Sequence, residues 1–504
     1  MRFGRVKLWW LVGVALIAPV LSQPKSPQTI QKRIAPHVVL FQEISAAPPL
    51  AIQGLRITPA RAVHIETALG NDVVLTEGAT RGREPVSRAA WRRRALAALN
   101  ADYFPYTGDP LGLCILRGEL VSEPFPNRPA IGWRPDGKVV MGAPLLDAEL
   151  IRPDGARIAL SGINRPARTN NDLVLFTRFF GATALLEAKP PQQVNGATEI
   201  ASVAIVLDAL TRPLRVGSTA QAVVREVLPG ASSAPIPPTG GVLIGTGAAA
   251  NFLQALQPNQ FVQIRVDLKG DGASEWREVT EAIAGGPWLV RGGKVVPPAE
   301  YEQAGFNRGF WERRHPRTAV GRTEKGELIW LVVDGRQPHS QGASLPELAQ
   351  IMQRYGAVDA INLDGGGSST LVVCDLVINS PSDGSERPVA NLWLLYDHAL
   401  RPTLPRARYR IEPPTATLKV GEQVRFRIWQ ETQPVSTWDA IWGCNTGIGF
   451  VDQWGQFTAL RPGQGVVSVY IDQQWLHVPI VVESSAPPET PNQDGGAGGN
   501  RTHE

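Results

Sequence analysis

A short stretch from Asp359 to Val373 holds the residues of this chain that are best suited to chemistry. Asp364 ends an apolar run and precedes a Gly-Gly-Gly-Ser-Ser sequence. Glycines permit a tight turn with positive φ and let a ligand approach the backbone, and successive N–H groups in such a turn can bind an anion. The stretch therefore offers a carboxylate beside an anion cradle, although a glycine hairpin whose Asp caps its own turn gives the same pattern.

The residues before this stretch predict the elements that position it. Residues 328–334 (LIWLVVD) are typical of a buried strand, and residues 344–347 (SLPE) form a capping box with Pro in the first helical turn. Leu345, Leu348, Met352 and Tyr355 then recur at helical spacing. If the two flanking strands pair in parallel through a right-handed crossover, Asp334 and Asp364 lie at strand carboxyl ends on one sheet edge, where ligands of α/β sheets bind.

Several motifs in this order resemble those of the phosphodiester glycosidases, a family that includes the enzyme removing N-acetylglucosamine from a mannose-6-phosphate diester. The matching segments are Asn100–Phe104, Gly285–Arg291, Arg317–Gly321, Asp334–Gly335, Ile361–Thr370 and Asn379–Asp383. They extend over roughly residues 90 to 400, and the match is weak between about 137 and 280. At position 102 an Asp replaces the small residue usual in the family, which adds a carboxylate.

The resemblance implies hydrolysis of a glycosyl phosphodiester at the sugar carbon–oxygen bond. Such a site needs positive charge or N–H groups on the phosphate and a carboxylate near the anomeric carbon. The predicted catalytic residues are Asp364, Asp334, Arg317 and Asp102. The predicted substrate-binding residues are Asn100, Gly285, Gly286, Thr318, Asn362, Gly365, Gly366, Gly367, Ser368, Ser369, Arg165 and Arg168.

Several candidate residues also have structural interpretations. The planar guanidinium of Arg317 matches a phosphate in a bidentate manner, but it could instead form a buried ion pair with Asp364 or Asp334. Asn100 could bind sugar or phosphate, or it could close a turn. His315 and His339 lie in loops near these motifs and are candidate proton shuttles, although a lone His is more often incidental.

Composition limits the class of protein. The chain has 504 residues, of which 43% are hydrophobic and 19% charged, so a sizeable core is expected. The net charge of +4 is scattered, without the basic, aromatic-interleaved stripe of a nucleic-acid-binding protein. Cys114, Cys374 and Cys444 are far apart and form no C-x-x-C motif, so at most one disulfide, for example between Cys114 and Cys374, is conceivable.

The sequence divides into six segments. Residues 1–22 combine a basic start with a short apolar run and predict a signal peptide or an uncleaved signal anchor. A Pro- and Gln-rich linker is expected over 23–50, the glycosidase-like domain over 51–400, and a second linker over 401–408. Short strands over 409–483 resemble bacterial Ig-like modules, and the tail at 484–504 is expected to be disordered. The helix-like run 91–99 is expected to lead into Asn100.

These features predict an α+β domain, with a mixed sheet and flanking helices, followed by a small all-β sandwich. The predicted function is an exported hydrolase of the periplasm, cell envelope or extracellular space, acting on a phosphorylated or envelope glycan such as an exopolysaccharide. The alternatives are a non-catalytic glycan-binding protein and a different glycan-processing enzyme on the same fold. No cofactor is required, a divalent cation near Asp334 or Asp364 is an open alternative, and membrane contact is expected only through an uncleaved N-terminal segment.

Overall fold

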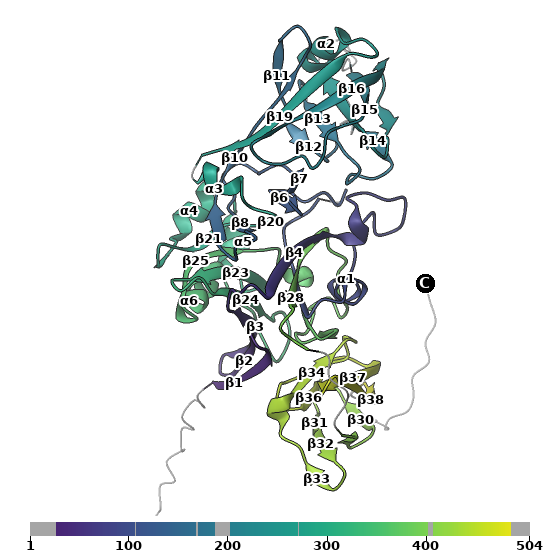
Figure 1. Ribbon diagram of the computed structural model, residues 1–504. Coiled ribbons are helices and arrows are strands. Elements are labelled where there is room, and N and C mark those ends of the chain that lie inside the picture. Colours follow the sequence, from purple (N-terminus) through teal and green to yellow (C-terminus); the bar gives the residue numbers. More distant parts are fainter. Residues whose placement is uncertain are drawn as a thin grey trace, which may run out of the picture.

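The computed structural model describes residues 27–105, 107–167, 170–186, 202–270, 272–401 and 407–484 (Figure 1). The predicted leader (1–22), Arg168 and residues 485–504 of the predicted tail lie outside these ranges. The fold is mostly β, with 47% of residues in strands and 11% in helices. No helix within the described residues combines the length and the apolar character needed to cross a bilayer.

An eight-stranded sheet forms the middle of the molecule, in the order β1-β2-β3-β24-β23-β25-β21-β22 (Figure 1). Its strands are β1 (Gln28–Ala35), β2 (Val38–Ala46), β3 (Pro49–Ile57), β24 (Leu328–Val333), β23 (Arg317–Thr323), β25 (Ala357–Asn362), β21 (Trp288–Arg291) and β22 (Lys294–Val295). Alternate residues of β24 pack into two different cores, Trp330 on one face and Leu331 on the other, because successive side chains of a strand point to opposite faces. Every neighbouring pair is antiparallel, so the expectation of a mixed sheet is wrong for this part of the chain.

The predicted strand–helix–strand unit is present, but its strands do not pair with each other. Helix α6 (Leu345–Arg354) begins at the predicted capping box, in which the Ser344 hydroxyl accepts from the Glu347 N–H. β24 and β25 each pair antiparallel with β23, which lies between them. They therefore point the same way, as predicted, and the start of β23 lies at the same edge as their carboxyl ends. This arrangement brings Arg317 to the edge of the sheet that carries Asp334 and Asp364.

A five-stranded sheet packs on one face of the central sheet and shares its core. Its strands are β27 (Leu376–Val377), β26 (Leu371–Val373), β5 (Ala97–Asn100), β28 (Asn391–Asp397) and β4 (Val63–Leu69). Helix α1 covers Val86–Arg93 and ends at Arg94, which has a left-handed φ of 54°. The helix expected over 91–99 is therefore wrong from Arg94 onward, because the chain leaves the helix there and residues 97–100 extend as β5.

A second lobe, at the top of Figure 1, consists of residues inserted between the motif-bearing segments. Its eight-stranded sheet contains β11 (Arg157–Ala159), β10 (Leu145–Ile151), β19 (Phe261–Lys269), β16 (Ser218–Pro229), β15 (Ser202–Asp208), β18 (Gly241–Thr246), β13 (Leu173–Phe176) and β12 (Gly162–Ile163). A two-stranded sheet joins β14 (Thr183–Leu185) and β17 (Ser233–Pro235), and a five-stranded sheet joins β7 (Glu119–Ser122), β6 (Cys114–Leu116), β20 (Glu281–Ala284), β8 (Ala130–Trp133) and β9 (Val139–Gly142). Helix α2 (Ala248–Gln254) packs on β15 and β18 of this lobe, and α3 (Ala273–Trp276) follows β19. Helices α4 (Pro298–Gln303) and α5 (Arg308–Glu312) lie beside the central sheet instead (Figure 1).

The C-terminal region folds around a core of its own, below the rest in Figure 1. Its sheets join β29 (Tyr409–Glu412), β32 (Arg427–Gln430) and β33 (Gln433–Pro434); β30 (Ala416–Lys419), β38 (Gln474–Glu483), β37 (Gly463–Ile471) and β34 (Ala440–Cys444); and β31 (Gln423–Arg425), β36 (Gln456–Ala459) and β35 (Gly449–Val451). The short strands are as expected, and their Ig-like assignment stays a prediction. All three cysteines are buried and free, so the conceivable Cys114–Cys374 disulfide is not formed.

The N-terminal segment expected to be a linker is instead part of the central sheet. Residues 28–46 form β1 and β2, so the linker prediction is wrong for these residues. The Lys32 side chain is buried, and its Nζ donates to the carbonyl oxygens of Ala440 (2.5 Å) and Gln453 (2.6 Å). This strand therefore attaches the C-terminal region to the central sheet.

Replacing Lys32 by Met should weaken this junction. The substitution leaves two buried carbonyl groups without a donor, which should lower the free energy of unfolding by about 2 kcal/mol. Chemical denaturation followed by tryptophan fluorescence would measure the loss. Lys419→Met is the matched control because Lys419 is exposed, and equal stability of the two variants would contradict the role of Lys32 at the junction.

Candidate active site

The turn after β25 approaches neighbouring backbone so closely that it requires glycine. A β-carbon on Gly365 would lie 2.8 Å from the Pro316 carbonyl oxygen, and Gly366 has a φ of 62°. Residues Gly366–Ser368 form a short 3-10 helix. The N–H of Gly366 donates to Pro316 and the N–H of Ser368 donates to Gly365. Several N–H groups of the predicted cradle are therefore already bonded, one to Pro316 and others within the turn itself.

Each glycine of this turn faces a different arginine. A β-carbon added to Gly365 would lie 3.9 Å from Cδ of Arg317. One added to Gly366 would lie 3.3 Å from Nη2 of Arg336, and one added to Gly367 would overlap Nη2 of Arg387. Three arginine side chains thus lie beside the turn, although only Arg317 among them was predicted. We refer to Asp364, Gly365–Gly367 and the three arginines as the arginine-ringed turn.

Asp364 is the carboxylate of this site, and it is partly exposed. Burial raises the pKa of its carboxyl group to about 6, although a hydrogen bond with Ser368, the charge of Arg387 and the Gly365 N–H oppose the shift. The backbone carbonyl of Asp364 accepts from Nδ2 of Asn100 at 2.7 Å. The residue is therefore fixed in position and can exchange a proton near neutral pH.

Asp102 is buried close to this site, with 1% of its surface exposed. Its two carboxylate oxygens accept from the N–H groups of Tyr103 and Gly112, both at 2.7 Å. Burial raises the pKa of Asp102 to about 7, the charge of Arg128 lowers it, and the charge of Asp364 raises it further. Asp102 thus closes its own loop and interacts electrostatically with Asp364.

Asp334 is buried and has a complete set of hydrogen-bond partners. Its carboxylate accepts from the Ser380 N–H (3.0 Å) and from Nδ2 of Asn379 (3.2 Å), and it contacts Nε2 of His339 at 3.2 Å. The geometry therefore gives Asp334 a positioning role for the loop at Asn379–Ser380. Because the Asp334 side chain is buried, the structure gives no support to its predicted catalytic role.

Arg317 contacts main-chain carbonyls and no carboxylate among the described residues. Its Nε donates to Ala343 (2.9 Å), its Nη2 donates to Phe310 (2.7 Å) and Arg313 (3.1 Å), and its guanidinium stacks over the Phe310 ring. Burial lowers the pKa of Arg317 to about 10, so it remains charged at neutral pH. The alternative of a buried ion pair is wrong, and only Nη1 is left to face a ligand.

The predicted polar residues form a buried network that holds the strands together. The Thr318 hydroxyl donates to Oδ1 of Asn100 (2.9 Å) and contacts the Ser369 hydroxyl (3.1 Å). On the other side, Nδ2 of Asn362 donates to the carbonyl of Gly286 (3.1 Å), and the Tyr103 hydroxyl donates to the same carbonyl at 2.7 Å. These contacts position the turn rather than present donors to a ligand, which favours the structural interpretation of Asn100.

Gly285 also packs tightly, since a β-carbon there would lie 2.4 Å from the Asn362 carbonyl oxygen. Arg165 lies in the second lobe, where it pairs with Glu123 (2.7 Å) and Asp172 (3.2 Å), so it is not brought to the arginine-ringed turn. Arg168 is outside the described residues. Within the described ranges, no three His, Cys, Asp or Glu residues are placed to hold a metal ion.

Two arginines of the site were missed in the sequence. Arg336 follows the Asp334–Gly335 motif directly, and its Nε and Nη2 contact Nδ1 of His315 at 3.3 and 3.1 Å. Arg387 pairs with Asp383 at 2.7 Å, four residues before it. The spacing of Asp383 and Arg387 after the Asn379 motif was the available signal, but the packing against Gly367 is not visible in the sequence.

The C-terminal region contacts both loops that border the site. Nη2 of Arg461 donates to the Ser382 carbonyl (2.9 Å) and Nη1 donates to Gly447 (3.0 Å), close to the Asp383–Arg387 pair. The ring of His339 stacks on Phe450 with centroids 4.6 Å apart. The loops that carry Arg387 and His339 are therefore supported from outside the central sheet.

Comparisons with known proteins show which proteins this chain resembles. Residues 217–396, about a third of the chain, match the family model described as phosphodiester glycosidase. The bovine N-acetylglucosamine-1-phosphodiester alpha-N-acetylglucosaminidase is 38% identical over 121 residues, which are 22% of this chain and 22% of that protein. The match thus spans about a fifth of the length of this curated relative.

Solved structures extend the similarity to the fold. A hypothetical protein from Synechocystis has a TM-score of 0.60 at 21% identity, covering 74% of this chain and 64% of that chain. A protein from Burkholderia pseudomallei has a TM-score of 0.56 at 26% identity, covering 70% of this chain and 74% of that chain. The fold is therefore shared with these two proteins.

The two carboxyl groups near the arginine-ringed turn should titrate near neutral pH. With ¹³C-labelled aspartate, NMR should show two side-chain carboxyl signals changing with apparent pKa values of about 6 and about 7. Asp364→Asn should remove the first signal and lower the pKa of Asp102, because a nearby negative charge is lost. Asp154→Asn, at an exposed loop, should leave both unchanged. Titration of all aspartates near pH 4 would contradict the effect of burial on Asp364 and Asp102.

Proposed function

We propose that this chain is a phosphodiester glycosidase, a hydrolase that cleaves the bond between the anomeric carbon of a sugar and the oxygen of its phosphodiester. The products are a free sugar and a phosphomonoester. The observation that carries the proposal is the arginine-ringed turn, in which the partly exposed Asp364 precedes three glycines that each face an arginine side chain, and in which the charge of Arg387 acts on the Asp364 carboxyl group. The family match of residues 217–396 supports the same reaction class.

The charges around the turn suit this reaction. A phosphomonoester is a weakly basic leaving group, so its departure depends less on a strong general acid than on stabilisation of its negative charge. Arg317 and Arg336 form no ion pair with a carboxylate within the described part of the chain, and Arg387 adds a third guanidinium beside Gly367. Together they would hold the phosphate.

Asp364 would act on the sugar side of the scissile bond. Its carboxylate is the partly exposed one, whereas Asp102 and Asp334 are buried. It could attack the anomeric carbon or activate a water, and the anomer released first would distinguish retention from inversion. Asp102, with its raised pKa, would tune the protonation of Asp364 through their mutual repulsion.

The setting of the reaction is also a proposal. The basic and apolar start of the sequence supports export to the periplasm, envelope or extracellular space, where an envelope glycan or exopolysaccharide would be the substrate. We propose an α+β glycosidase domain with a C-terminal Ig-like module as its architecture. No metal would be required, so chelation with EDTA should leave hydrolysis unchanged.

Hydrolysis of UDP-N-acetylglucosamine tests the proposed reaction, because N-acetylglucosamine is the sugar named for the bovine relative. The chain from Gln23 onward should release free sugar, and Asp364→Asn should lower kcat/KM by about 10³-fold. Activity should rise from pH 5 to pH 7 as the Asp364 carboxyl, with its pKa of about 6, loses its proton. Saturable binding of UDP-N-acetylglucosamine without any release would support a glycan-binding protein instead.

The arginines should matter only when the substrate contains phosphate. Arg336→Ala and Arg387→Ala should each lower kcat/KM for UDP-N-acetylglucosamine by about 10²-fold, because one stabilising charge on the leaving group is lost. Neither change should affect p-nitrophenyl N-acetylglucosaminide, a substrate without phosphate, whereas Asp364→Asn should impair both. Arg308→Ala, at an exposed ion pair with Glu312, is the control. Equal losses on both substrates would contradict a phosphate role.

A further inference from the structure

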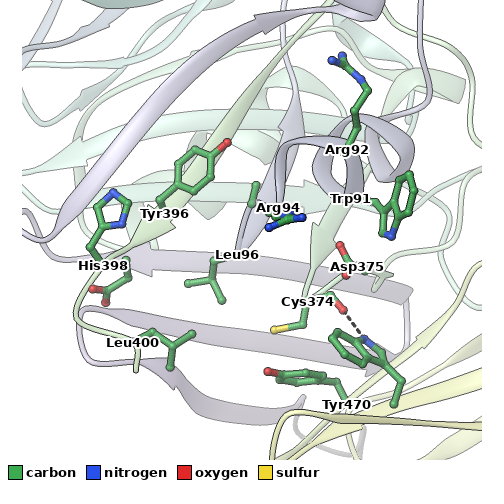
Figure 2. A pocket seen from close by; sticks show the side chains of 13 residues that line it. Trp91, Arg92, Arg94, Leu96, Cys374, Asp375, Tyr396, His398, Leu400 and Tyr470 are labelled. Carbon is green, nitrogen blue, oxygen red and sulfur yellow. Dashed lines mark hydrogen bonds between the residues drawn. The ribbon is translucent and has the colours of Figure 1, made fainter. Parts of the chain in front are cut away.

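A cleft of about 720 Å³ opens where the C-terminal region meets the five-stranded sheet (Figure 2). One wall includes Trp91 and Arg94 at the end of α1, and the facing wall includes Tyr470 and Trp475 from the C-terminal region. Tyr396 and His398 extend from the end of β28 at a third side (Figure 2). We call this cleft the junction groove. None of its residues belongs to the arginine-ringed turn.

Two tryptophan side chains of the junction groove are open to solvent, whereas Tyr396 and Tyr470 are half-buried. Trp91 is 69% exposed and Trp475 is 45% exposed. Trp475 is nevertheless held in place, since its Nε1 donates to the Cys374 carbonyl at 3.0 Å and its ring lies 4.9 Å from the ring of Tyr470. Exposed large aromatic groups gathered at a concave site mark a binding surface rather than a part of the core.

Polar groups of both signs accompany these rings. Arg94 is exposed and forms no ion pair within the described residues, in contrast to Arg92, which pairs with Asp72 and Glu84. Asp375 lines the groove, and its backbone carbonyl accepts from Nδ2 of Asn445. His398 is exposed as well. Donors and acceptors are therefore available beside the ring faces.

We propose that the junction groove binds an oligosaccharide segment, as a second glycan site separate from the arginine-ringed turn. A pyranose ring presents an apolar C–H face that packs on an aromatic ring and hydroxyl groups that pair with charged and polar side chains. The groove offers both kinds of partner. The mixture of Arg94 and Asp375 suits uncharged hydroxyls that donate and accept, whereas a purely anionic ligand would be repelled by the carboxylate.

The position of the groove relates it to the proposed active site. β5 and β26 pair antiparallel, with Leu371 opposite Leu99 and Val373 opposite Ala97. Their ends at Asn100 and Thr370 adjoin the arginine-ringed turn, and their opposite ends at Leu96 and Cys374 line the groove. At about 3.3 Å per residue, the two sites are separated by roughly 15 Å along these strands.

At this separation, the groove could hold a glycan substrate beside the proposed active site. A glycan polymer held in the groove would stay close to the active site, which raises its effective concentration there. That consequence rests on the proposed function, but binding in the groove does not require hydrolysis. The two ideas can therefore fail separately.

Binding of neutral oligosaccharides to the full chain tests the proposal. Isothermal titration of Asp364→Asn with N-acetylchitotetraose and with maltotetraose should show saturable binding of at least one of them. On this background, Trp91→Ala and Arg94→Ala should each weaken binding at least tenfold. Trp438→Ala is the matched control, because Trp438 is 55% exposed on the C-terminal region and does not line the groove.

The possible results separate the two proposals. Binding that Trp91→Ala weakens and Trp438→Ala does not would support the groove, even if the wild-type chain hydrolyses no phosphodiester. Absence of binding to both oligosaccharides, or equal losses in the Trp91 and Trp438 variants, would overturn it. Self-association in sedimentation that Trp91→Ala abolishes, without oligosaccharide binding, would also overturn it and assign the groove to a second copy of the chain.

Discussion

The candidate site depends on the close approach of one backbone turn to its neighbours. Gly365 leaves no room for a β-carbon beside the Pro316 carbonyl, and Gly367 leaves none beside the Asp383–Arg387 pair. Because these side chains are absent, arginine side chains from three separate segments lie beside one turn, and the charge of Arg387 acts on Asp364. The same proximity keeps Asp364 partly buried, which raises the pKa of its carboxyl group to about 6. Charge stabilisation and a carboxylate that titrates near neutrality thus have one structural cause.

The surrounding fold holds this turn from several directions. β23 lies between β24 and β25, so Arg317 begins a strand at the edge where the other two strands end. Asn100 fixes the carbonyl of Asp364, and Asp334 fixes the loop at Ser380. The C-terminal region adds the contact of Arg461 with Ser382. We therefore regard this region as a structural support of the site as well as one wall of the junction groove.

Local sequence signals predicted the turn, the capping box of α6 and the common direction of β24 and β25. They did not predict which polar residues remain open, because that depends on partners distant in the chain. The side chains of Asp334 and Asn100 form hydrogen bonds with residues far away in the sequence. Arg387 lies beside the turn because it packs on Gly367. The Pro and Gln content of residues 23–50 likewise predicted a linker where two strands form. The burial of Lys32 in the first of these strands depends on its contacts with Ala440 and Gln453 of the C-terminal region.

Hydrolysis in ¹⁸O-labelled water tests the central claim most directly, namely that the phosphate leaves from the anomeric carbon. If Asp364 directs attack at the sugar carbon, the phosphate product of UDP-N-acetylglucosamine hydrolysis will contain no ¹⁸O from water, and its ³¹P NMR signal will show no isotope shift. An ¹⁸O-shifted phosphorus signal would mean that water attacks phosphorus. The chain would then be a phosphodiesterase, which contradicts a glycosidase in which Asp364 acts at the sugar carbon.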